Sequence, residues 1–242
     1  MSVHSRIALQ LLALCLTLGA VGFAADATPP DASLYVVHGI PGRVVSADVN
    51  PGFPVDVLLN DQVCTIHGLA FTGSIGPLTL PPGDYDIKIS PANTLAPCTN
   101  SPQVETTVKL PAGGAATGAL ALSNGTPALL TFADNLKTVT AGQGRVIIAN
   151  AADAGTLDLA LTSLPITKTS KTRKFTLAPG AETTLELPIG GYSLVATASG
   201  GTTPLVTGIV IFDNQSTELV YFVGSPTDNS VTLVTRLIRD VF

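Results

Sequence analysis

The residues of this chain that could do chemistry are few, and most lie in its first half. His38 and His67 are two of only three histidines, and Cys64 and Cys98 are two of only three cysteines. Histidine can act as a general base, and Cys64 and His67 have the two-residue gap of a metal-binding pair. A zinc site normally needs a second such pair, and Cys98 has no second ligand beside it. A disulfide between Cys64 and Cys98 is therefore favoured over a metal site, provided that the chain is exported.

No sequence motif joins either histidine to a nucleophile. The chain has no Gly-x-Ser-x-Gly elbow, no His-Glu-x-x-His pair, no Walker loop and no Gly-x-Gly-x-x-Gly segment after a strand. A hydrolase that uses His38 or His67 is a remote alternative, because it would have a base without a recognisable partner. We expect no enzymatic activity, no cofactor and no metal.

A run of basic residues marks the second half of the chain. Lys168, Lys171, Arg173 and Lys174 lie within seven positions. They could bind an anionic partner, or they could protect an exposed edge strand against pairing with another sheet. The whole chain carries a net charge of -5 and contains no Trp, so it lacks the basic face and the stacking platform of a nucleic-acid-binding protein.

The N-terminus has the layout of an export signal. Arg6 precedes an apolar run over residues 7–22, and small residues follow it, so cleavage is expected after residue 24 or as late as residue 27. The run is shorter than the roughly 20 residues of a membrane-spanning helix. Cleavage also removes Cys15, and residues 25–32 would form a linker. The mature chain is therefore expected in the periplasm, at the cell surface or secreted, without a transmembrane span.

The mature chain contains an internal repeat. Leu-Pro-x-Gly-x-Tyr ends at Tyr85 and again at Tyr192, and other segments recur with a similar offset. We expect two modules, residues 33–140 and 145–242, separated by a glycine-rich segment. Each repeated tyrosine should open a strand with its ring inward and its hydroxyl on a backbone group, as corner tyrosines do in sandwiches.

Both copies also carry an aspartate at the centre of an apolar strand. Asp56 lies in Val-Asp-Val and Asp158 lies in Leu-Asp-Leu. Strand alternation favours a side chain that points to solvent. The alternative is a carboxylate that accepts backbone hydrogen bonds from a neighbouring loop and fixes that loop.

Short segments rich in Val, Ile, Leu and Thr alternate with Pro, Gly, Asn and Asp throughout the mature chain. The 23 Gly and 18 Pro residues agree with many tight turns. Residues 85–89 alternate between apolar and charged side chains, so one face should pack while the other meets water. About eight strands in each copy predict an all-β protein of two tandem antiparallel β-sandwiches, immunoglobulin-like or transthyretin-like, with one core each.

An ordered set of motifs resembles a bacterial domain-of-unknown-function family. The set comprises Leu34-Tyr-Val-Val-His-Gly, then Pro54-Val-Asp-Val, Leu80-Pro-Pro-Gly-Asp-Tyr and a late Asp134-Asn. The resemblance implies tandem β-sandwiches in secreted or cell-envelope proteins without an established activity. The first copy departs from the family pattern by an insertion from Pro41 to Phe53, and the family's histidine falls on Ala149 in the second copy. A structural role for His38 is therefore favoured.

These observations predict a non-catalytic exported protein that acts as an interaction or structural module of the cell envelope. Its partner would be an envelope polysaccharide or another surface protein. The alternative is a carbohydrate-binding or envelope-polymer-binding module that uses loops at one end of a sandwich or the groove between the modules. The low aromatic content, 5% of the chain, weakens that alternative, because sugars are usually stacked on aromatic rings.

Overall fold

The computed structural model describes residues 28–164 and 170–239. The expected signal segment and Lys168 lie outside the described residues. Within them the chain is almost entirely β-structure, and no described helix is long and apolar enough to cross a bilayer.

The chain forms two sets of eight strands, which we call the first and second modules. The first contains β1 (Ala32–His38), α2 (Gly42–Val45), β2 (Val55–Leu59), β3 (Val63–Leu69), β4 (Ser74–Leu80), β5 (Gly83–Pro91), β6 (Val104–Leu110), β7 (Ala115–Ser123) and β8 (Thr126–Asp134). The second contains β9 (Gln143–Asn150), β10 (Leu157–Ser163), β11 (Thr172–Leu177), β12 (Glu182–Pro188), β13 (Gly190–Ala198), β14 (Pro204–Phe212), β15 (Ser216–Val223), the short 3-10 helix η1 (Pro226–Asp228) and β16 (Thr232–Arg239).

The two modules have the same sheet topology. The first consists of the sheets β4-β1-β7-β8 and β3-β2-β5-β6, and the second of β12-β9-β15-β16 and β11-β10-β13-β14. Adding eight to each strand number converts the first pair of sheets into the second. The parallel pairing of β1 with β7 recurs as that of β9 with β15, whereas the other strand pairs are antiparallel. The prediction of two tandem β-sandwiches is confirmed, with one parallel pair in each.

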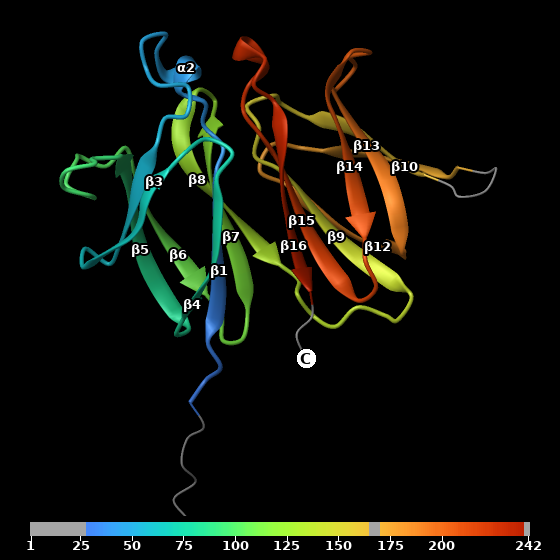
Figure 1. Cartoon of the computed structure of the whole chain (residues 1–242), viewed down its shortest axis with the longest axis horizontal. Helices are drawn as coiled ribbons and strands as arrows, with labels where there is room; N and C mark the ends of the chain where they lie inside the picture. The colour runs from blue at the N-terminus through green and yellow to red at the C-terminus, as the bar shows by residue number, and fades with distance from the viewer. Residues whose placement is uncertain (1–27, 165–169, 240–242) are drawn as a thin grey trace, which may run out of the picture.

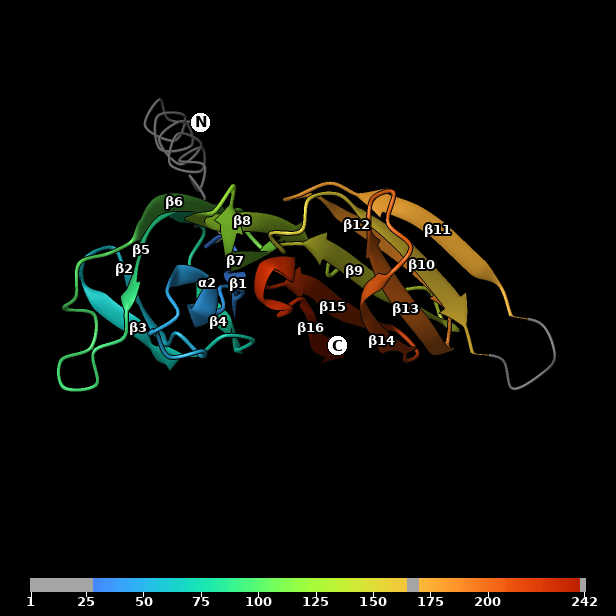
Figure 2. The same cartoon turned by 90° about the horizontal axis from the view of Figure 1, so that it is seen from above.

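The four sheets lie in four layers, with β4-β1-β7-β8 facing β12-β9-β15-β16 in the middle (Figures 1 and 2). Both faces of strand β1 are therefore packed. Leu34 and Val36 lie in the core of the first sandwich, while Tyr35 and Val37 pack against the second module. We call the apolar cluster between the modules the inter-module core. The expectation of one core per module, with a wet outer face, was therefore wrong for these middle sheets.

Polar side chains cross the inter-module core. The Tyr221 hydroxyl donates to Thr117 Oγ1 at 2.6 Å and lies 3.2 Å from Asp134 Oδ1. Thr117 in turn donates to Asp134 Oδ2 at 2.7 Å. Burial raises the pKa of Asp134 to about 6, against the lowering effect of these two hydroxyl groups. The network joins strands β7 and β8 of the first module to β15 of the second.

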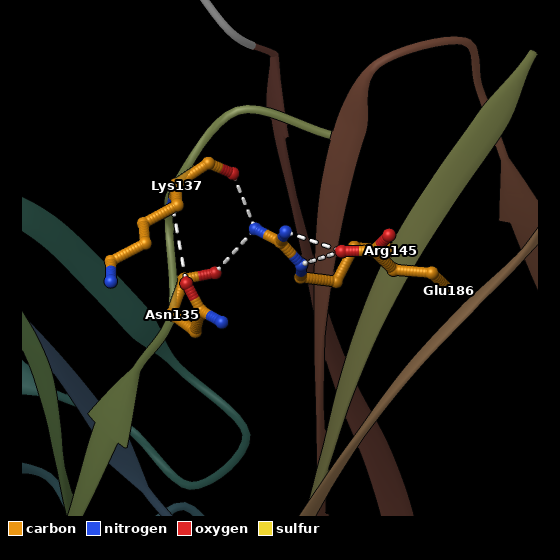
Figure 3. A network of polar contacts seen from close by, with 4 residues as sticks. All are labelled: Asn135, Lys137, Arg145 and Glu186. Atoms are coloured by element: carbon orange, nitrogen blue, oxygen red, sulfur yellow. Dashed lines mark hydrogen bonds and ion pairs between the residues drawn. The ribbon is translucent and has the colours of Figure 1, made fainter. Parts of the chain in front are cut away.

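Arg145 fixes the segment that connects the modules, as Figure 3 shows. Its guanidinium donates to the backbone carbonyl of Asn135 at 2.8 Å and to that of Lys137, and its Nε donates to Glu186 Oε1 at 3.1 Å. The Arg145 side chain is only 4% exposed. Loss of one of these partners would leave the buried Arg145 charge unpaired, which is strongly destabilising. The hydrogen bonds of Arg145 therefore hold the connecting segment in place. The connection is thus tied to β9 and β12.

The repeated tyrosines occupy equivalent corners. Tyr85 donates its hydroxyl hydrogen to the carbonyl of Pro81 at 2.7 Å, and Tyr192 donates to the carbonyl of Pro188 at 3.0 Å. The expected corner-tyrosine role is confirmed in both modules.

Candidate functional site

His38 ends β1 and is completely buried. Its Nδ1 accepts a hydrogen bond from the Ile40 amide at 3.2 Å, so Nε2 carries the proton that it donates to the Phe53 carbonyl at 2.7 Å. Burial lowers the pKa of this histidine, and the bond to Phe53 only partly opposes that effect. The neutral ring therefore holds together the two ends of the insertion at residues 41–53, which contains α2. No free nitrogen is left for proton transfer.

Asp56 points inward and is only 1% exposed, so the favoured expectation of a solvent-facing side chain was wrong. Its carboxylate accepts hydrogen bonds from the amides of Gly68, Asn93 and Cys98, at 2.9, 3.0 and 2.9 Å. Burial raises its pKa, but these donors outweigh burial and hold it below its ordinary value. A carboxylate with such partners is satisfied, and it fixes the neighbouring loop as the alternative interpretation described.

Cys64 and Cys98 form the predicted disulfide, with their Cα atoms 5.8 Å apart. It ties β3 to the segment at residues 92–103, between β5 and β6, which we call the stapled loop. The exposed His67 places Nδ1 3.3 Å from the Cys64 sulfur. Both cysteine sulfurs are thus committed to each other, and the described residues contain no cluster of three or more potential metal-ligating side chains.

Asp158 is the counterpart of Asp56 in the second module, and it lies closer to solvent. Its carboxylate accepts a hydrogen bond from the Gly200 amide at 3.1 Å and lies 3.5 Å from the Ser199 hydroxyl. The connection it contacts is the short turn between β13 and β14, at residues 199–203. Here a shorter connection leaves the carboxylate with one backbone donor.

The basic run does not form a single patch. Arg173 pairs with Leu161 across the β10–β11 ladder, and Lys174 pairs with Ala160, so the two cations project from opposite faces of β11. Lys171 and Arg173 line a cleft at the open edge of the second sandwich, whereas Lys174 lies on the outer face of the sheet. Lys168 lies outside the described residues.

Sequence reasoning missed the inter-module contacts of Asp134, Thr117, Tyr221 and Arg145. Asp134 belongs to the late Asp-Asn motif, which carried part of the family resemblance, and this was the one available signal. The partners of Asp134 lie 17 and 87 positions away in the chain, and no local pattern reports such distances.

Several solved structures resemble the fold at low sequence identity. A candidate cell adhesion protein from Bacteroides ovatus is 9% identical over 89% of this chain and 99% of its own, with a TM-score of 0.30. One from Bacteroides uniformis is 9% identical over 86% of this chain and 98% of its own, with a TM-score of 0.27. The TIE protein of Bacillus anthracis is 15% identical over 79% of this chain and 33% of its own, with a TM-score of 0.25.

No curated protein matches the chain. A family model described as a domain of unknown function, DUF4397, matches residues 32–160. That range begins with β1, covers the whole first module and ends within β10 of the second. This match covers more than half of the chain, in agreement with the ordered motifs, and the chain therefore belongs to the DUF4397 family.

Proposed function

We propose that the protein is an exported, non-catalytic interaction module of the cell envelope. The observation that carries the proposal is the stapled loop, which the Cys64–Cys98 disulfide and the buried Asp56 carboxylate hold in place. Disulfides persist in oxidising compartments, which supports a location outside the cytoplasm. A buried carboxylate and a disulfide that together order one surface loop also support a role for that surface.

The stapled loop is ordered by its own hydrogen bonds and exposes an apolar side chain to solvent. The Asn93 side chain accepts hydrogen bonds from the amides of Leu95 and Ala96, both at 3.1 Å, and its own amide group donates to Thr99. Leu95, within this loop, is 95% exposed. A loop that is already ordered loses little conformational entropy when it binds, so its contacts contribute more of their energy to affinity.

The groups that could have served a reaction instead serve the scaffold. His38 has both ring nitrogens in hydrogen bonds, and Asp56 accepts from three amides. His67 is the exposed histidine of the described residues, and its ring faces a disulfide sulfur. These assignments support a binding role over a catalytic one.

Fractionation of the cells that produce the protein tests this proposal. We expect the protein in the envelope or the medium, with its N-terminal signal segment removed and with Cys64 and Cys98 in one linked peptide by non-reducing mass spectrometry. After mixing with isolated envelope material and centrifugation, the purified protein should be found in the pellet. After mixing with an equal mass of cytosolic protein, it should remain in the supernatant. A reduced protein in the cytoplasm would overturn the proposal, as would a hydrolase activity that His67→Ala abolishes without loss of fold.

A further inference from the structure

We propose that the cleft between β11 and β12 binds an acidic sugar unit of an envelope polysaccharide. This inference rests on the proposed function and deepens it, because it names a partner class and a site. The cleft has a volume of about 300 Å³, which is within the range of small-molecule sites. Its lining includes Leu161, Lys171, Arg173, Leu187, Pro188 and Tyr192.

The cleft exists because β11 and β12 are edge strands of the two sheets of the second sandwich. Leu161 and Leu187 form part of its floor and belong to the core of that sandwich. Tyr192 spans the gap, since it stands on β13 and bonds through its hydroxyl to Pro188 at the end of β12. The floor is therefore apolar and firmly held.

The rim of the cleft is cationic. Arg173 of β11 and Lys171, directly before that strand, both line the cleft, and both residues are exposed. Burial raises the pKa of Tyr192 while the charge of Arg173 lowers it, in agreement with a guanidinium close to the phenol. Among the described residues no carboxylate lies within ion-pair distance of Lys171 or Arg173, although Lys88, Arg145 and Arg239 all have such partners. The two rim cations are available to an incoming anion.

An acidic sugar fits this combination better than the other anions do. A sugar ring has an apolar face that can lie on the exposed Pro188 and on the small part of Tyr192 that reaches the surface, 8% of that residue, while its carboxylate or phosphate group meets the cations on the rim. A bilayer surface is flat, so it would contact the outward Lys174 at least as well as the recessed cleft. An acidic peptide could pair with the β11 edge through its backbone, and such pairing would not require the apolar floor of the cleft.

The two faces of β11 provide a charge-matched test on the full-length protein. Binding of tetragalacturonate is measured by calorimetry for the wild type, Arg173→Glu and Lys174→Glu, with circular dichroism as the check of fold. Loss of a charge-assisted contact predicts at least about a tenfold weaker affinity for Arg173→Glu. Lys174→Glu carries the same change in charge on the opposite face and should stay within about threefold of the wild type.

Other outcomes would overturn the inference. Equal losses in both variants would mean general attraction of anions, and equal binding of maltotetraose would mean that the cations are not used. Tighter binding of polyglutamate or of phosphatidylglycerol vesicles would assign the cleft to an acidic protein or to a membrane. If the wild-type protein bound neither tetragalacturonate nor polyphosphate, an acidic-sugar site in this cleft would be ruled out. None of these results would change sedimentation with envelope material, so failure here is distinguishable from failure of the proposed function.

Discussion

The two modules share one topology but differ in the connection that follows their fifth strand. In the first module this connection is the stapled loop, which closes over Asp56 and supplies two of its three amide donors. In the second it is the short turn at residues 199–203, which leaves Asp158 near solvent with one backbone donor. The aspartate at this strand position is therefore buried in the first module, where the connection is long, and partly exposed in the second module, where it is short.

This difference shows which features belong to the shared scaffold and which belong to one module. The corner tyrosines and the sheet order recur, so they serve the sandwich itself. The disulfide, the insertion at residues 41–53 and the full set of Asp56 donors occur in the first module, where they order surface segments. The cationic cleft belongs to the second module. Each module thus adds its own surface to a common frame.

Removal of the disulfide should have the largest effect and should be confined to the first module. The bond closes a loop of 34 positions, so replacing both Cys64 and Cys98 by Ser should lower the free energy of unfolding by about 3 to 4 kcal/mol. Thermal unfolding followed by far-ultraviolet circular dichroism measures the loss. Hydrogen exchange should show faster opening at residues 92–103 and no change at residues 199–203. Equal changes in both connections would contradict the assignment.

The two aspartates should differ in their contribution to stability. Asp56→Ala leaves three amides without their acceptor and should cost about 2 to 3 kcal/mol, because buried unsatisfied donors are expensive. Asp158→Ala removes one backbone contact near solvent and should cost at most about 1 kcal/mol. Denaturant titration of both variants compares them directly. A larger loss in Asp158→Ala would reverse the comparison.

Asp56 and Asp134 should respond to pH in opposite directions. Asp56 has a lowered pKa, so the stability it contributes is present at neutral pH and is lost as the pH falls below its ordinary range near 3.8. Asp134 has a pKa raised to about 6, so it favours the folded state in acid, and that contribution is lost as the pH rises through that value. Between about pH 5 and about pH 7.5 Asp134 should reduce stability by about 1 kcal/mol.

Asp134→Asn should remove the larger part of this loss of stability between about pH 5 and about pH 7.5. Denaturant titration at these two pH values measures the loss. The groups that face Asp134 are the hydroxyls of Thr117 and Tyr221, the Tyr35 ring and the Glu182 carboxylate. Burial also raises the pKa of Glu182, which therefore acts in the same direction and leaves a residual slope. An unchanged slope in Asp134→Asn would assign the effect to the other carboxyl groups whose pKa burial raises, Glu182 and Glu218.

The corner tyrosines should give the smallest effects, and equal ones. Tyr85→Phe and Tyr192→Phe each remove one hydroxyl hydrogen bond to a proline carbonyl, at a cost of about 1 kcal/mol. Thermal unfolding of the two variants should agree within experimental error. A clear difference between the two losses of stability would mean that the corner tyrosines do not contribute equally to the two sandwiches.

Local patterns predicted much of this fold. The turn residues and short apolar segments located the strands, and the repeated Leu-Pro-x-Gly-x-Tyr predicted both corners, because a turn and its following residue are neighbours in the chain. The disulfide followed from the cysteine count together with the expected export of the chain. These features depend on a few adjacent residues or on arithmetic.

The remaining features depend on contacts between distant segments. Asp56 was expected to face water because alternation describes a strand and does not report a loop that folds over it. The inter-module core was missed although β1, β7, β9 and β15 carry nearly continuous apolar runs, which are typical of strands buried on both faces. The split of the basic run depends on the register of β11 against β10.

The inter-module core also bears on how this chain can be divided. A cut between Asp134 and Gln143 would separate two complete sandwiches, yet it would expose Tyr35 and Val37 on one piece and Ile147 and Tyr221 on the other. A bare apolar sheet face of that kind favours aggregation or pairing with another copy of itself. The smallest portion of this protein that can be produced alone, transplanted or fused to another protein is therefore the pair of sandwiches.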